Sequence, residues 1–186
     1  LLDSLLDVFE CDRAWLVYPC DPDSPTWQIF MERIRPEYLS TLPIGVELPL
    51  GPTGVEVFQI LRNSNAPVKF GPDSKYPVPE EMKKSSNVRS FIAMATYPKI
   101  GKPWSFGLHQ CSYARVWTSE EERLLQEIGR RISDALTSFL AYRNLRESEE
   151  RYRMVFENSP VSIWEEDFSE VKTLFDGLRK EGVVDI

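Results

Sequence analysis

The sequence predicts an α+β domain: an antiparallel sheet with helices packed on one face and a long helix at its carboxyl end. Two pairs of apolar segments, 13–18 with 27–35 and 88–97 with 104–111, are each joined by turn residues and predict two β-hairpins. Leucines at helical spacing precede the first pair. Residues 119–158, with one glycine and no proline, follow the second. This order of helices and strands is typical of an α+β fold.

The irregular region between the two hairpins, residues 36–79, is long for a compact domain. It holds eight of the fourteen prolines, and within it 55–61 predicts a short helix and 67–70 a short strand. Irregular segments of this length inside a domain are usually functional. We therefore expect the region to form a lid or a pocket wall, followed by a helical turn at 80–84.

The helix predicted for 119–158 begins at a capping box, with Thr118 as N-cap and Glu121 three residues on. At 1.5 Å per residue a continuous helix here is ~60 Å long, about twice the span of a small domain. Six residues step along it by three and four, the spacing of a seam for a partner helix: Leu125, Ile128, Ile132, Ala135, Phe139 and Tyr142. We expect this helix to dock on its own domain and to form a parallel homodimer with a second copy.

Charge and composition exclude several classes of partner. The net charge of −7 argues against nucleic acid and against an anionic membrane surface as the main partner. No apolar run approaches the ~18–20 residues of a membrane span. The chain opens on Leu1 rather than methionine, so we expect a piece of a longer protein. Three cysteines without metal-binding spacing, Cys11, Cys20 and Cys111, are typical of a reducing compartment and predict a cytoplasmic location.

Strand 104–111 carries the candidate site residues. Period-2 alternation places a bulky row on one face, which should pack under the helices: Trp104, Phe106, Leu108 and Gln110. It places a small and polar row on the other face: Ser105, Gly107, His109 and Cys111. Such a row leaves room for a ligand against the sheet. Coverage of this face by the 36–79 loops, with no ligand, is an equally good interpretation.

The chemistry available to that row is limited. His109 is the single histidine of the chain, and a satisfied core histidine is one interpretation of it. Cys111 read alone is a small buried hydrophobe. As a pair on one strand face, His109 and Cys111 have Cα atoms ~6.6–6.8 Å apart, so both side chains can touch one flat ligand. An example is a haem whose iron the imidazole ligates. The sequence shows no other metal site and no catalytic constellation, so we expect these residues not to form an enzyme.

Residues 50–54, 66–68, 90–93, 104–112 and 115–121 share the pattern of one family. Together they resemble a GAF domain, most similar to those of sensor histidine kinases near the phytochrome-like and cyanobacteriochrome branch. The resemblance covers about residues 1–146.

A second resemblance follows the long helix. Residues 152–167 look like the start of a PAS domain, which predicts a truncated PAS segment at 159–186 with a helix at 169–180.

The GAF resemblance implies a regulatory, non-catalytic module that binds a cyclic nucleotide, a tetrapyrrole or haem, or that only relays a signal in a dimer. In the phytochrome-like branch a histidine of the last strand faces the chromophore, and His109 matches that position. The family's bilin-attaching cysteine precedes the strand equivalent to 88–97. Residues 74–81 contain neither cysteine nor histidine, so a covalent bilin is not expected. Haem over His109 and Cys111 stays open.

The implied function is a sensory module of a cytoplasmic two-component histidine kinase. A ligand or partner signal would shift the dimeric 119–158 helices and so act on downstream PAS and kinase domains, with the kinase outside these residues. Two alternatives stay open: a ligand-free GAF domain that serves as a dimerisation spacer, and a haem-based redox or gas sensor that uses His109 and Cys111.

Overall fold

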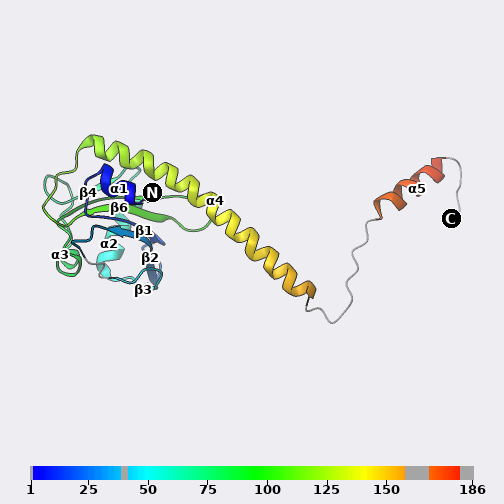
Figure 1. The fold of residues 1–186 in the computed structure, drawn as a ribbon, viewed down its shortest axis with the longest axis horizontal. Helices are drawn as coiled ribbons and strands as arrows, with labels where there is room; N and C mark the ends of the chain where they lie inside the picture. Colours follow the sequence, from blue (N-terminus) through cyan, green and yellow to red (C-terminus); the bar gives the residue numbers. More distant parts are fainter. Residues whose placement is uncertain (1, 39–41, 158–167, 181–186) are drawn as a thin grey trace. The chain divides into compact units, whose positions relative to one another are not determined.

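The computed structural model describes residues 2–38, 42–157 and 168–180. These residues form five helices and six strands (Figure 1): α1 (Leu2–Val8), β1 (Arg13–Tyr18), β2 (Thr26–Ile34), β3 (Leu48–Pro49), α2 (Pro52–Arg62), β4 (Val68–Phe70), α3 (Glu80–Ser86), β5 (Ser90–Thr96), β6 (Trp104–Gln110), α4 (Ser119–Glu157) and α5 (Ser169–Lys180). All helices and strands predicted from the sequence are present, and the two-residue strand β3 is an addition.

Residue contacts divide the chain into two compact units, 1–142 and 143–186. Unit 1 contains the sheet, α1 to α3 and the first part of α4. Unit 2 contains the rest of α4 and α5, and α5 forms where the sequence predicts a helix. Residues 158–167 of the PAS-like stretch lie outside the described residues. The domain boundaries at 146 and 159 therefore stay predictions.

The sheet confirms the α+β class. Its strands lie in the order β3-β2-β1-β6-β5-β4, and all neighbours pair antiparallel. The predicted hairpins are β1–β2 and β5–β6, and the pairing of β1 with β6 joins them in the middle of the sheet. Because β5 and β6 have a neighbour on each side and elements packed above and below, all of their residues are buried.

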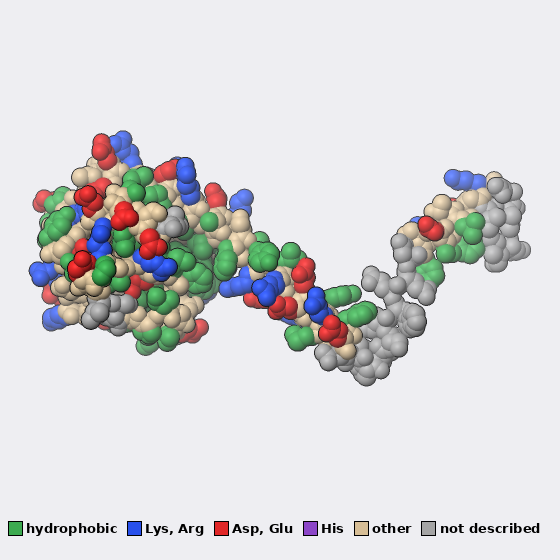
Figure 2. Space-filling view, viewed as in Figure 1, with side chains coloured by type: hydrophobic (Ala, Val, Ile, Leu, Met, Phe, Trp, Pro, Cys, Tyr) green, Lys and Arg blue, Asp and Glu red, His purple; other side chains and the backbone are tan. Residues whose placement is uncertain are grey.

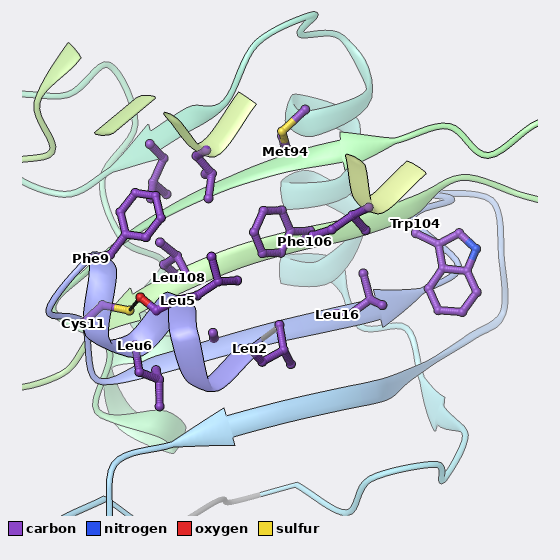
Figure 3. Close-up of a cluster of buried hydrophobic side chains, with 14 of the residues drawn as sticks. Leu2, Leu5, Leu6, Phe9, Cys11, Leu16, Met94, Trp104, Phe106 and Leu108 are labelled. Atoms are coloured by element: carbon purple, nitrogen blue, oxygen red, sulfur yellow. Dashed lines mark hydrogen bonds between the residues drawn. The ribbon is translucent and has the colours of Figure 1, made fainter. Parts of the chain in front are cut away.

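Two separate hydrophobic clusters cover the two faces of the sheet. The first, drawn in Figure 3, joins α1 and α4 to the row of Trp104, Phe106 and Leu108 on β6. The second joins α2 and α3 to the opposite face. The sequence predicted helices on one face, and the structure adds α2 and α3 on the other. For clarity, the face under α1 and α4 is called the helical face, and the face under α2 and α3 the cavity face.

α4 begins at the predicted capping box. The Glu121 amide donates to Thr118 Oγ1 at 3.2 Å, and the Thr118 amide donates back to Glu121 Oε2 at 2.7 Å. Further along, one stripe of the helix packs on the helical face: Leu125, Gly129, Ile132, Leu136 and Leu140. The end of the Met94 side chain of β5 lies directly against Gly129, in space that a Cβ at this position would occupy.

This docking corrects part of the predicted dimer seam. Leu125 and Ile132 lie in the core of their own domain, and Ile128 is partly buried against it. Ala135, Phe139 and Tyr142 are exposed, the last at 66%. A repeat of three and four serves equally for docking on a sheet and for a coiled coil. The amino-terminal residues of the repeat therefore pack on the sheet of their own domain.

No helix among the described residues is both long enough and apolar enough to cross a bilayer.

Candidate functional site

A β-bulge in β2 decides which of its residues reach the cavity face. In the β1–β2 register Phe30 is an extra residue, and such an insertion breaks simple alternation. Phe30 packs edge-on against Trp104 on the helical face. Two residues later Glu32 lies opposite Trp15 of β1 and is buried. The bulge thus brings a carboxylate into the middle of the cavity face.

A cavity of about 390 Å³ lies over this face, bordered by the sheet, α2, β3 and α3. Six of the apolar residues that line it come from β2, β3, α2 and β5: Trp27, Ile29, Leu48, Val57, Phe58 and Phe91. Small-molecule sites usually measure ~300–1,000 Å³, with mainly apolar walls and a few polar groups. The cavity fits this description near the small end of the range. The irregular region predicted to be a pocket wall supplies much of it.

The floor of the cavity holds a buried ion pair. Arg13 Nε lies 3.5 Å from Glu32 Oε1, and both side chains are almost completely buried. Arg13 is opposite His109 in the β1–β6 register, so three ionisable side chains meet on neighbouring strands. Buried charges of this kind are retained only when they are paired. Glu32 keeps one oxygen, Oε2, with no hydrogen-bond partner.

His109 stands at the centre of this floor and is 7% exposed. Its ring lies between Trp15 and Phe91, with centroid distances of 5.4 and 5.5 Å. Neither ring nitrogen has a hydrogen-bond partner, which excludes a hydrogen-bonded core histidine. Burial, together with the nearby Arg13 cation, holds the pKa of His109 well below its usual value. The imidazole is therefore neutral at pH 7, with one nitrogen as donor and the other as acceptor.

Of the four candidate residues, only His109 lines the cavity. The space over Gly107 is filled, because a Cβ there would lie 2.6 Å from Trp15 Cζ2 and 2.8 Å from Ala93 Cβ. Ser105 is completely buried further along β6. Cys111 follows the end of β6, and its Sγ lies 3.9 Å from the Ser86 carbonyl. The predicted pocket row of four is thus corrected to one residue, because Trp15 from the neighbouring strand occupies the space that the small residues leave.

The cavity residues do not fit a haem. His109 offers one axial nitrogen, but Cys111 does not share the cavity with it, and its thiol pKa is raised by burial. Burial also raises the pKa of Cys11 and Cys20 to about 12, and neither lines the cavity. Among the described residues that line the cavity, the one cation is Arg13, which is engaged with Glu32, so haem propionates would lack a counter-charge. Among the described residues, no group of three or more His, Cys, Asp or Glu could hold a metal ion.

The sequence interpretation missed Arg13 and Glu32. Both are charged residues at or inside apolar strand segments, where alternation with neighbouring apolar residues hides them. A signal was available: in a 13–18/27–35 hairpin the two residues fall close together, and a charge in a buried strand needs a partner. Their exact pairing depends on the bulge at Phe30, which alternation does not predict.

Solved structures of GAF domains share this fold. A red/green cyanobacteriochrome in its red-light-absorbing state matches 76% of this chain and 92% of its own length, with a TM-score of 0.60 and 16% identity. The blue-light-absorbing form of the PixJ GAF domain of Thermosynechococcus elongatus matches 81% of this chain and 88% of its own length, at a TM-score of 0.60 and 15% identity.

A third structure, the phycocyanobilin-bound GAF domain of a cyanobacterial phytochrome, matches 74% of this chain and 80% of its own length, at a TM-score of 0.57 and 16% identity. No protein-family model and no curated protein sequence matches the chain. At these identities the likeness concerns the fold alone. The order of the strands, the helices that cover the sheet and the likeness to these solved structures together show that the chain has the fold of a GAF domain.

Proposed function

We propose that unit 1 is a sensory GAF module that binds a small molecule in the cavity and passes the occupied state to α4. The observation that carries this proposal is the set of buried polar atoms without partners on the cavity floor: both His109 ring nitrogens, Glu32 Oε2 and Trp15 Nε1. Leaving such an atom unsatisfied costs ~1–3 kcal/mol, and a ligand toward which these side chains turn would offer the missing partners.

Structures with the same fold support this proposal. One of them is described as holding phycocyanobilin, and others are cyanobacteriochromes named for the light they absorb. No cysteine is among the described residues that line the cavity, so we propose a non-covalent ligand. We also propose that the module itself is not an enzyme, because its polar floor lacks an activated nucleophile.

The route to α4 runs through β6. His109 faces the cavity, and the next residue, Gln110, accepts a hydrogen bond from Arg115 Nη1 at 3.0 Å through its side-chain oxygen. Arg115 Nη2 pairs with Glu121, which closes the capping box of α4 with Thr118. A ligand that moves the end of β6 would act on the first turn of the helix. For this to transmit a signal, the ligand must bind two arrangements of the module with different affinity.

For the output we propose a parallel homodimer through the exposed part of α4. Its exposed apolar residues continue at heptad-like spacing from unit 1 into unit 2: Ala135, Phe139, Tyr142, Leu145, Tyr152 and Phe156. Figure 2 shows hydrophobic side chains along this part of the helix. We propose that the dimer controls a PAS segment beginning near 159 and a histidine kinase downstream, in the cytoplasm.

A binding screen on the whole chain tests the sensory function. Ligand-observed NMR with neutral, anionic and cationic aromatic fragments should detect at least one class that binds. The matched control is Val57→Phe, which places a larger side chain in the cavity from α2 and should weaken that binding. If no class binds the wild type more strongly than Val57→Phe, the cavity is not a ligand site.

A sedimentation experiment tests the relay. Wild-type chain should dimerise, and Leu145→Glu, which places a charge in the seam, should be monomeric. Val57→Phe, as a mimic of a partly occupied cavity, should change the dimer dissociation constant. An unchanged constant would contradict coupling between cavity and helix, and a monomeric wild type at high concentration would contradict the seam.

The second candidate function is the ligand-free dimerisation spacer. The packing of Trp15 over Gly107 favours it, because the small face predicted to hold a ligand is filled by the protein itself. The two functions share the dimer and differ in the fragment screen, where a spacer gives no binding in any class.

A further inference from the structure

The cavity floor selects for hydrogen bonding along one edge of an occupant. The unpartnered atoms comprise one acceptor, Glu32 Oε2, one donor, Trp15 Nε1, and a neutral His109 that supplies one of each. All three side chains are more than nine-tenths buried, so water from bulk does not serve them freely. The unpartnered atoms are also shielded from the cavity, so an occupant that presents a donor and an acceptor side by side satisfies them when these side chains turn toward it.

The charge of the floor is already balanced. Arg13 and Glu32 neutralise each other at 3.5 Å, and the remaining charge in the lining, Glu81, belongs to an exposed residue of α3. An anionic or cationic occupant would bring an uncompensated charge into a site walled by apolar side chains, which is strongly unfavourable. The balance therefore favours an uncharged occupant.

The walls and the volume of the cavity favour a flat and small occupant. Aromatic rings of Trp15, Trp27, Phe58 and Phe91 border the space between the sheet and α2. Aromatic side chains bury planar ring systems well, by stacked or edge-on contact. At about 390 Å³ the cavity suits two or three fused rings better than an open tetrapyrrole.

From these three features we propose that the ligand is an uncharged, planar aromatic or heteroaromatic molecule of two or three rings with an amide-type donor–acceptor edge. Its edge meets Glu32, His109 and Trp15, and its ring plane lies among the aromatic walls. This inference rests on the proposed sensory function and names the ligand class of that same cavity. Carboxylate-bearing tetrapyrroles and nucleotides fall outside the class, because each carries a charge that the floor does not match.

Calorimetric titration of the whole chain with 2-naphthamide and with 2-naphthoate tests the charge preference. The two probes share a ring system and differ chiefly in charge at neutral pH. We expect 2-naphthamide to bind at least about tenfold more tightly, because the carboxylate loses its hydration without gaining a counter-charge. Equal affinities, or a preference for 2-naphthoate, overturn the proposal.

His109→Phe tests the polar edge. Phenylalanine keeps a ring between Trp15 and Phe91 and removes two nitrogens that have no protein partner, so the fold should persist. We expect about a tenfold loss of 2-naphthamide affinity. Naphthalene, which has no polar edge, should bind the variant at least as well as the wild type. Unchanged affinity for 2-naphthamide overturns the role of the imidazole.

Glu32→Gln tests the balance of charge directly. It leaves Arg13 as the only charge on the floor, so the preference should move toward 2-naphthoate. The matched control is Glu56→Gln, an exposed residue of α2 that does not line the cavity, which should leave both affinities unchanged. Thermal unfolding reports whether Glu32→Gln is folded; if it is not, the wild-type and His109→Phe titrations still decide.

Failure of this inference is distinguishable from failure of the sensory function. Binding of 2-naphthoate, or of haemin with a sharp Soret band, in place of 2-naphthamide overturns the ligand class and keeps the cavity as a sensor site. Binding of none of these probes, with wild type and Val57→Phe alike, contradicts both proposals.

Discussion

The two faces of the sheet in unit 1 use the same strands for different purposes. On the helical face, Phe106 and Leu108 of β6 are completely buried under α1 and α4, and the Met94 side chain lies directly against Gly129 of α4. On the cavity face, the residue between Leu108 and Gln110 is His109, which lines an open space beside a buried ion pair. One strand thus contributes to a close-packed core and to a cavity through alternate residues.

The pleat of the sheet directs alternate residues of a strand to opposite faces. Residues that stabilise the fold and residues available for binding therefore lie on different faces. The helical face gains its free energy from close packing, which tolerates little loss of volume. The cavity face is less closely packed and contains buried polar atoms without hydrogen-bond partners. The indole nitrogens of Trp104 and Trp117 also lack partners on the helical side, but these residues do not line the cavity. Changes on the first face should therefore affect folding, and changes on the second should affect binding.

The largest expected effect is on the helical face. Phe106→Ala should lower the free energy of unfolding by ~3–5 kcal/mol, because it removes a completely buried ring from a close-packed cluster. Phe58→Ala on the cavity face should cost less, since its ring already lacks neighbours on the side of the cavity. Urea denaturation of both variants measures the contrast. Equal losses would show that the cavity face is packed as closely as the helical one.

Gly107→Ala should cost ~1–3 kcal/mol, although it adds one methyl group. The new Cβ would lie within 2.8 Å of the Ile92 carbonyl oxygen as well as against Trp15, and a backbone atom cannot move aside freely. Gly177→Ala is the matched control, because nothing lies within 4 Å of that position in α5. Thermal unfolding should separate the two. A Gly107→Ala protein as stable as the control would mean that space remains over β6 for a ligand.

His109→Phe should make the protein less sensitive to acid. The pKa of His109 is lowered in the folded state by burial and by Arg13, so below pH ~6.5 the unfolded chain binds a proton that the folded chain does not. Wild-type stability should therefore fall as pH decreases from ~6.5 toward the folded pKa, by up to ~1.4 kcal/mol per pH unit from this residue.

The measurement is the difference in unfolding free energy between wild type and His109→Phe from about pH 7.5 to about pH 5, a range that spans the ordinary histidine pKa of ~6.5. The variant should gain on the wild type as pH falls. A difference that stays constant over this range would show that His109 titrates normally, which contradicts its burial without partners.

The smallest expected effect is at the start of α4. Thr118→Ala removes the hydroxyl that accepts from the Glu121 amide and should cost ~1 kcal/mol of unit 1 stability. Thr118→Ser keeps a hydroxyl and is the matched control, expected near wild type. If the helix terminus also carries the signal from the cavity, Thr118→Ala will in addition reduce the effect of Val57→Phe on the dimer constant. A capping role alone would leave that effect intact.

Local sequence patterns predicted the elements of this chain well. Apolar periodicity located the helices and strands, and the Thr118–Glu121 pattern predicted a capping box that the hydrogen bonds confirm. Alternation in β6 correctly separated Phe106 and Leu108 from His109. These features depend on residues close together in the sequence, whose relative positions are fixed by the pitch of a helix or the pleat of a strand.

Contacts between distant residues had to come from the tertiary structure. Trp15 fills the space over Gly107, so small residues on β6 did not mean an open pocket. The bulge at Phe30 places Glu32 beside Arg13. Leu125 and Ile132, predicted to lie in a dimer seam, pack instead on the sheet under α4. The sequence by itself determined which residues alternate and repeat. Which side chain occupies the space that each leaves depends on register and close packing between strands and helices far apart in the chain.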